Sequence, residues 1–76
     1  MKKEKAKEEK IKYANLQNKI LIHKKYNTRM QIIDIGIEET CSKKNNFYVF
    51  CKLNGELGTV TETLEYVLEN YRANSD

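Results

Sequence analysis

The chain has 76 residues, of which 39% are hydrophobic and 33% charged, and its formal net charge is +3. This length and composition predict one small globular domain spanning residues 1–76, which buries only about 60% of its unfolded surface and leaves no room for a deep enzymatic cleft. Residues 1–30 carry ten Lys/Arg and three Glu, about +7, whereas residues 31–76 carry four Lys/Arg and eight Asp/Glu, about −4. A concentrated basic segment attracts phosphates or an acidic protein surface.

The first element is expected to be a long N-terminal helix. Residues 3–26 contain no Gly or Pro and are rich in good helix formers. One side of this helix would carry, at three- and four-residue steps, Ala6, Tyr13, Leu16, Ile20, His23 and Tyr26. Residues 1–10 have almost no apolar side chains, so we expect them to fray or project. The run Ile20–Ile22 leaves a short strand open as an alternative.

Three strands follow in the prediction. Between Met30 and Glu39, Ile33, Ile35 and Ile37 alternate with polar residues, although Ile32 breaks the pattern. Residues 47–53 (FYVFCKL) form a second strand rich in aromatic and β-branched residues. The dipeptide Asn54-Gly55 then predicts a type I′ turn leading into a third strand, Glu56–Val60.

A two-residue turn at Asn54-Gly55 would fix the register of this hairpin, with Leu53 opposite Glu56 and Lys52 opposite Leu57. Because strand side chains alternate, one face would then hold Phe47, Val49, Cys51, Leu53, Gly58 and Val60. The other face would hold Tyr48, Phe50, Lys52, Leu57 and Thr59. We expect the first face to be the core.

A C-terminal helix completes the predicted chain. Residues 59–62 (TVTE) offer a capping box, and an apolar stripe follows with Val60, Leu64, Val67, Leu68 and Tyr71. Residues 73–76 are expected to be a loose tail. The predicted fold is therefore α+β, with a long N-terminal helix, a three-stranded antiparallel β-meander and a C-terminal helix.

No catalytic constellation is visible, so the chain is not expected to be an enzyme or to use a metal, cofactor or small-molecule substrate. His23 is the only imidazole and is expected to be a partly exposed helix residue. Glu38 and Glu39 are adjacent in a strand and point to opposite faces. Cys41 and Cys51 lack zinc or redox spacing and are expected to be reduced thiols. The absence of a spanning segment or signal-like apolar region predicts a cytoplasmic protein.

The basic segment is one candidate binding site. A nucleic-acid-binding surface would use Lys2, Lys3, Lys5, Lys7, Lys12, Lys24, Lys25, Lys43 and Lys44. Lysine outnumbers arginine twelve to two, which favours diffuse electrostatic attraction over bidentate readout. The alternative is a solvated helix whose Lys/Glu pairs only maintain solubility.

The second candidate is the outer sheet face, where Tyr48, Phe50 and Lys52 stand on one strand. Aromatic side chains interleaved with lysine occur in protein interfaces, including homodimers, and also stack nucleic-acid bases. The alternative is that the long N-terminal helix covers this face.

The order of elements resembles two nucleic-acid-binding families, and small phage inhibitors of host defence can share the same compact plan, so the order fits both classes of partner. The order helix, three strands, helix is similar to the double-stranded-RNA-binding fold, and the hairpin NNFYVFCKLNGELG followed by a helix resembles the arm-type domains of phage and transposon integrases. The RNA-binding fold would place a lysine cluster at the start of the last helix, whereas this chain has Thr61-Glu62-Thr63 there.

These observations predict a small non-enzymatic binding protein. We expect a regulator or inhibitor that docks on another protein, because the acidic second half would repel a phosphate backbone. Nucleic-acid binding, including DNA binding, through the lysine-rich helix and the CSKKNN loop is the alternative. Abundant Lys, Asn and Ile with no Trp or Pro is a bias expected of an AT-rich genome or of a mobile element living in one, and we expect a phage or mobile-element type of accessory protein.

Overall fold

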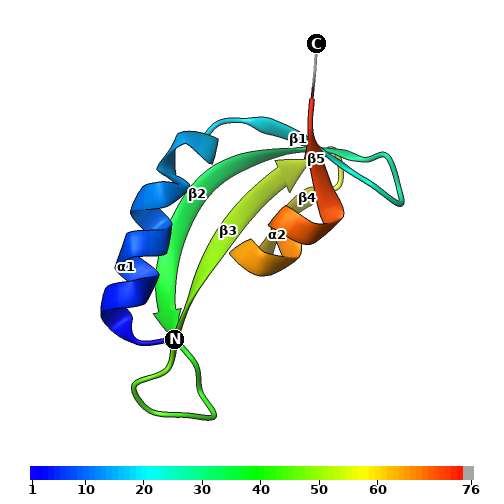
Figure 1. Ribbon diagram of the computed structural model, residues 1–76. Coiled ribbons are helices and arrows are strands. Elements are labelled where there is room, and N and C mark those ends of the chain that lie inside the picture. Colours follow the sequence, from blue (N-terminus) through cyan, green and yellow to red (C-terminus); the bar gives the residue numbers. More distant parts are fainter. Residues whose placement is uncertain (75–76) are drawn as a thin grey trace.

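The computed structural model describes residues 1–74. In chain order the elements are α1 (Lys3–Lys12), the 3₁₀ helix η1 (Ala14–Leu16), β1 (Ile20–His23), β2 (Arg29–Glu39), β3 (Phe47–Gly55), β4 (Gly58–Thr63), α2 (Leu64–Asn70) and β5 (Tyr71–Ala73). The strands form one antiparallel sheet in the order β4-β3-β2-β1-β5 (Figure 1). The predicted α+β class is confirmed, but the three-stranded meander with a long N-terminal helix is wrong.

The N-terminal helix ends at Lys12, so the prediction of a helix continuing to Tyr26 is wrong. Asn18 turns the chain with a φ of 70°, and β1 then pairs with β2 on one side and β5 on the other. Leu21 is buried at 6% exposure in this strand. Hydrogen bonding along both edges and burial of alternate side chains outweigh a helix propensity that differs by only tenths of a kcal/mol per residue. The strand alternative for Ile20–Ile22 is the observed structure.

A β-bulge explains why Ile32 interrupts the alternation of β2. Ile32 lies opposite Leu53 and Asp34 lies opposite Lys52, so Ile33 is an extra residue between the two pairs. Ile32 is completely buried, whereas Ile33 remains 39% exposed. Beyond the bulge, Ile35 resumes the buried face, as the two-residue period predicts.

The β3–β4 hairpin turns two residues later than predicted. Gly55 pairs with Gly58, which leaves Glu56 and Leu57 in the turn, and Gly58 adopts a φ of 124° that favours glycine. Leu53 therefore lies opposite Val60 rather than opposite Glu56. The displacement is four residues, an even number, so the predicted division of side chains between the two faces is preserved.

α2 begins later than the predicted capping box. Thr63 is its N-cap, and the Thr63 hydroxyl accepts a hydrogen bond of 3.1 Å from the Tyr66 N–H. β4 occupies the residues that were predicted to cap the helix. Ala73 belongs to the predicted loose tail, but in the structure it lies in β5 and pairs with Leu21 of β1. Residues 75–76 of that tail lie outside the described residues.

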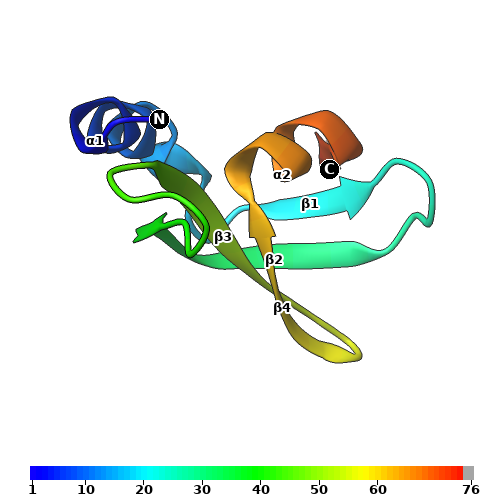
Figure 2. The same cartoon turned by 90° about the horizontal axis from the view of Figure 1, so that it is seen from below.

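Both helices pack on the same side of the sheet, which we call the inner face (Figure 2). The core between helices and sheet consists of Ala6, Leu21, Ile32, Ile35, Val49, Cys51, Leu53, Leu64 and Val67. Ala6 is completely buried, so α1 is docked from its first turns. Within residues 1–74 no element covers the opposite side of the sheet, which we call the outer face.

Candidate functional site

The outer face carries the three residues that the sequence singled out for partner binding. Val49, Cys51 and Leu53 of β3 point into the core, so the intervening Tyr48, Phe50 and Lys52 point away from both helices. Tyr48 and Phe50 are half-buried and Lys52 is exposed. The alternative that the N-terminal helix covers this face is wrong, because α1 lies on the inner face.

The strand register adds three β2 residues that sequence reasoning did not include. Gly36 lies opposite Phe50, and its neighbours Asp34 and Glu38 lie opposite Lys52 and Tyr48. A Cβ at Gly36 would approach Phe50 Cζ to 2.5 Å, so the aromatic ring lies directly over the glycine backbone. The sequence shows that these three residues alternate with isoleucines along β2, but only the strand pairing shows that they lie opposite the β3 residues of this face.

Tyr48 is fixed by one of these carboxylates. Its hydroxyl donates a hydrogen bond of 3.1 Å to Glu38 Oε2, and this bond raises the pKa of Tyr48 above its ordinary value. Beside the ring lies a hollow of about 400 Å³ lined by Thr40, Tyr48, Thr61, Glu62 and Thr63. The outer face therefore presents two aromatic side chains, Tyr48 and Phe50, next to a shallow depression. We call Asp34, Gly36, Glu38, Tyr48, Phe50 and Lys52 the outer-face patch.

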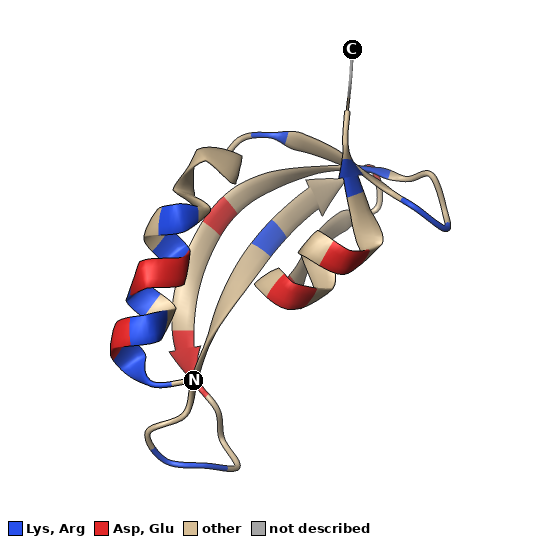
Figure 3. Cartoon of the chain, viewed as in Figure 1, with Lys and Arg blue, Asp and Glu red and all other residues tan. Residues whose placement is uncertain are grey.

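The structure divides the predicted nucleic-acid-binding lysines between two ends of the molecule (Figure 3). The amino group of Met1 donates to Asn46 Oδ1 and to the Phe47 carbonyl, and the Phe47 N–H donates to the Met1 carbonyl at 2.6 Å. These bonds bring the start of α1, with Lys2, Lys3, Lys5 and Lys7, to the same end as the loop that carries Lys43 and Lys44. Lys12 lies at the far end of α1.

Lys24 and Lys25 lie in the β1–β2 loop, at the other end of the sheet (Figure 3). Lys24 Nζ donates a hydrogen bond of 3.0 Å to the Glu69 carbonyl near the end of α2. Lys25 Nζ lies 5.3 Å from the centre of the Tyr26 ring, within cation–π range. Both side chains thus have intramolecular contacts, and they do not join the other lysines.

His23 is a buried structural residue rather than a partly exposed helix residue. It is 5% exposed, and its Nδ1 accepts hydrogen bonds from the N–H groups of Lys25 and Tyr26 at 3.0 and 3.3 Å. Because Nδ1 accepts, the proton of the neutral ring is on Nε2, which lies 3.2 Å from Tyr66 Oη. The imidazole therefore closes the β1–β2 turn.

The two thiols have different environments. Cys41 is exposed and Cys51 is buried, and both are free. Burial raises the pKa of Cys51 to about 11, which keeps this thiol protonated and unreactive at neutral pH.

In the described part of the chain, residues 1–74, no three His, Cys, Asp or Glu side chains gather as a metal site would require. None of the helices found there has the length and apolar character that crossing a membrane needs. No protein-family model matches the sequence, and neither the curated proteins nor the solved structures give a match. The outer-face patch combines two half-buried aromatic rings with one lysine and two carboxylates.

Proposed function

We propose that this chain is a small non-enzymatic binding protein, a cytoplasmic regulator or inhibitor that docks on another protein through the outer-face patch. One observation carries the proposal: Phe50 and Tyr48 stand on a sheet face that neither helix covers. Interfaces concentrate their binding energy in a few aromatic and cationic side chains surrounded by polar residues. Two free thiols are in keeping with a reducing compartment.

The charges next to these rings favour a protein over a nucleic acid. The patch contains one cation, Lys52, and two carboxylates, Asp34 and Glu38. Its net charge of −1 opposes a phosphate backbone, whereas a protein partner can satisfy both signs with its own polar rim. A phage or mobile-element origin, which the amino-acid bias favours, is part of the same proposal.

Phe50→Ala provides the test of this function. The tagged chain and the variant are compared by affinity capture from host extract with and without nuclease, and the captured protein is then titrated with each purified chain. We expect Phe50→Ala to weaken binding to a purified partner by about 1–2 kcal/mol or more, roughly a tenfold or larger increase in Kd.

Leu57→Ala is the matched control, because Leu57 is a fully exposed apolar residue at the tip of the β3–β4 hairpin. This variant should bind as the wild type does. Equal affinity of the wild type and Phe50→Ala for the purified partner would contradict the proposal. Self-association abolished by Phe50→Ala would instead identify the partner as a second copy.

Nucleic-acid binding is the second candidate, favoured by the lysines gathered where α1 begins beside the β2–β3 loop. If they bind phosphates, replacing Lys2, Lys3, Lys43 and Lys44 with Gln should flatten the salt dependence of duplex binding by up to about 0.9 for each phosphate that is no longer neutralised. Electrophoretic mobility shifts over a salt series measure this slope. No retardation of DNA or RNA at low salt would rule the candidate out.

A further inference from the structure

The inner side of the molecule carries a groove that shares Tyr48, but not Phe50 or Lys52, with the outer-face patch. It has a volume of about 600 Å³ and runs between α1 and α2. Its lining consists of Met1, Glu9, Tyr48, Val49, Thr63, Leu64, Glu65, Leu68 and Glu69. Val49 and Leu64 are only 3% and 2% exposed, so they form an apolar floor, while Leu68 is 43% exposed on the wall.

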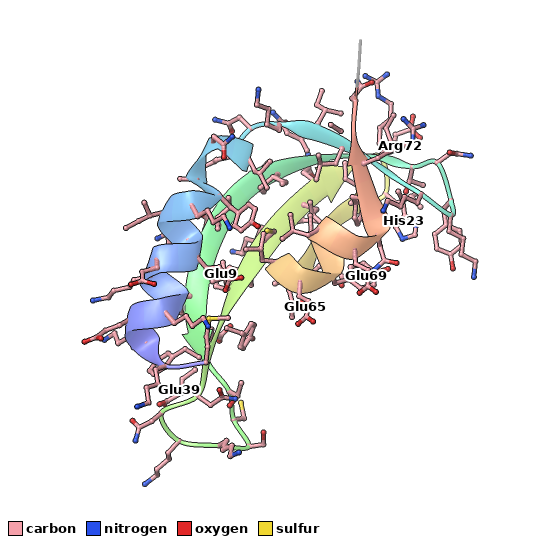
Figure 4. All side chains as sticks on the ribbon, viewed as in Figure 1. Glu9, His23, Glu39, Glu65, Glu69 and Arg72 are labelled. Carbon is pink, nitrogen blue, oxygen red and sulfur yellow. The ribbon has the colours of Figure 1, made fainter. Side chains whose placement is uncertain are left out.

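The rim of this groove is acidic. Figure 4 shows Glu9 on α1 and, across from it, Glu65 and Glu69 on α2. Glu65 and Glu69 are exposed. The one cationic group in the lining, the amino group of Met1, already donates to Asn46 and Phe47. An occupant of this groove must therefore combine an apolar side chain with positive charge.

The same chain carries a segment with that chemistry. On α1, Ile11 is 77% exposed, although it lies in a regular helix. Lys7, Lys10 and Lys12 lie within four residues of it, with Glu8 as the carboxylate closest to it along the helix face. α1 thus presents an apolar anchor among cations on the side turned away from its own core.

We propose that this groove binds α1 of a second copy, so that two chains form a dimer in which each α1 lies in the acidic groove of its partner. Ile11 enters between Leu64 and Leu68, and Lys7 and Lys10 face Glu65 and Glu69. The contact is isologous, because the groove and the inserted helix belong to each chain and the same contact occurs twice. The separation of the sequence into a basic first part and an acidic remainder is then what holds the dimer together.

The dimer is expected to be weak, because one apolar anchor and a few exposed ion pairs supply little free energy. Exposed pairs are screened by water and salt, and interfaces of this limited kind belong to transient complexes. Sedimentation equilibrium of the purified chain should detect a dimer with a Kd of roughly 10–1000 μM at low salt. Dissociation should increase as NaCl is raised, since the ion pairs are solvent-exposed.

A charge-swap pair gives the decisive experiment. Variant one is Glu65→Lys/Glu69→Lys and variant two is Lys7→Glu/Lys10→Glu. Each variant alone should be monomeric, because a groove and a helix of the same sign then face each other. An equimolar mixture should restore a dimer with a Kd within about threefold of the wild type, because both contacts are complementary again.

Two further measurements distinguish this dimer from misfolding of the variants and from association through the outer-face patch. Circular dichroism melts of both charge-swap variants should show folded chains. Ile11→Ser should weaken the dimer, whereas Leu57→Ser, the same kind of change at another exposed apolar residue, should not. Phe50→Ala should leave the dimer intact, so the groove contact and the outer-face function can fail independently. A wild type that stays monomeric up to about 1 mM, or a mixture that fails to associate, would overturn the inference.

Discussion

The contact of Phe50 with Gly36 shows how a single residue shapes the outer face of the sheet. A Cβ at position 36 would lie only 2.5 Å from Phe50 Cζ, so the ring occupies space that a side chain there would need. Glycine in a strand interior usually weakens it, but a cross-strand aromatic ring that covers the glycine restores packing. The position of the Phe50 ring therefore depends on the absence of a side chain at Gly36.

Gly36→Ala should destabilise the fold by roughly 1–3 kcal/mol, because the new methyl group forces the Phe50 ring from its place. In the Phe50→Ala background the same change should cost little, since the obstructing ring is gone. Urea denaturation of the four chains of this double-mutant cycle measures the coupling. A Gly36→Ala effect that is equal in both backgrounds would show that the ring does not lie over the glycine.

Cys51 gives the fold a specific response to alkaline pH. Burial raises its pKa from 9.0 to about 11, so the unfolded chain loses the thiol proton at a lower pH than the folded chain does. Below about pH 9 the Cys51 thiol is protonated in both the folded and the unfolded chain, so its full contribution to the unfolding free energy is present there. It falls as the pH rises from about 9 toward 11, by up to about 1.4 kcal/mol per pH unit.

Cys51→Ala should flatten this alkaline decline in urea unfolding measured between about pH 8 and 11. In the folded wild type, a thiol reagent should modify Cys41 promptly and Cys51 only on unfolding, because the first thiol is exposed and the second buried. Rapid modification of both thiols in the folded protein would contradict the burial of Cys51.

At the scale of the element, α2 separates two leucines that look equivalent in the sequence. Leu64 is 2% exposed at the start of the helix, next to the Thr63 cap, whereas Leu68 is 43% exposed on the wall of the groove. The apolar stripe predicted both as core residues. Leu64 and Val67 are the buried residues of α2, and Leu68, one residue beyond Val67, lies at the margin of that buried face.

Leu64→Ala should therefore lower the unfolding free energy by about 2–5 kcal/mol, as expected for a buried leucine. Leu68→Ala should cost clearly less, because much of its surface is already in contact with water. Thermal melts of the two variants, with Thr63→Ala at about 1 kcal/mol as an internal reference for the cap, check this order. Equal losses for the two leucines would mean that Leu68 is covered.

For the whole molecule, α1 matters more to stability than its lysine-rich sequence indicates. A chain this small has little core to spare, and α1 contributes the completely buried Ala6 and packs on β2 and β3. Figure 1 shows the helix along one margin of the sheet and α2 along the other. Without α1, part of the inner face would be exposed to water.

Deletion of residues 1–12 should abolish cooperative unfolding or lower the midpoint strongly in urea titrations. Replacing Lys2, Lys3, Lys5 and Lys7 with Gln is the matched control, because it removes charge but keeps the helix and Ala6. That variant should unfold within about 1 kcal/mol of the wild type, as exposed charges contribute little. A truncated chain as stable as the full chain would show that α1 is dispensable.

The sequence by itself determined the parts of the structure that depend on local periodicity. The two-residue alternation along β3 placed Val49, Cys51 and Leu53 on the core side and Tyr48, Phe50 and Lys52 on the other. That division survived a four-residue error in the hairpin register, because strand side chains alternate with a period of two. The candidate residues on β3 were predictable for the same reason.

Only the tertiary structure decided which segments became strands and what faced the aromatic pair. Ile20–His23 continued a helical pattern with a strand as the alternative, and Tyr71–Ala73 belonged to a predicted helix end and tail, but the two segments pair with each other in the sheet. A helix satisfies its hydrogen bonds within its own segment, whereas a strand needs a partner distant in sequence, which no local pattern names. The carboxylates of Asp34 and Glu38 beside the rings, and the groove between the two helices, arise from those distant pairings.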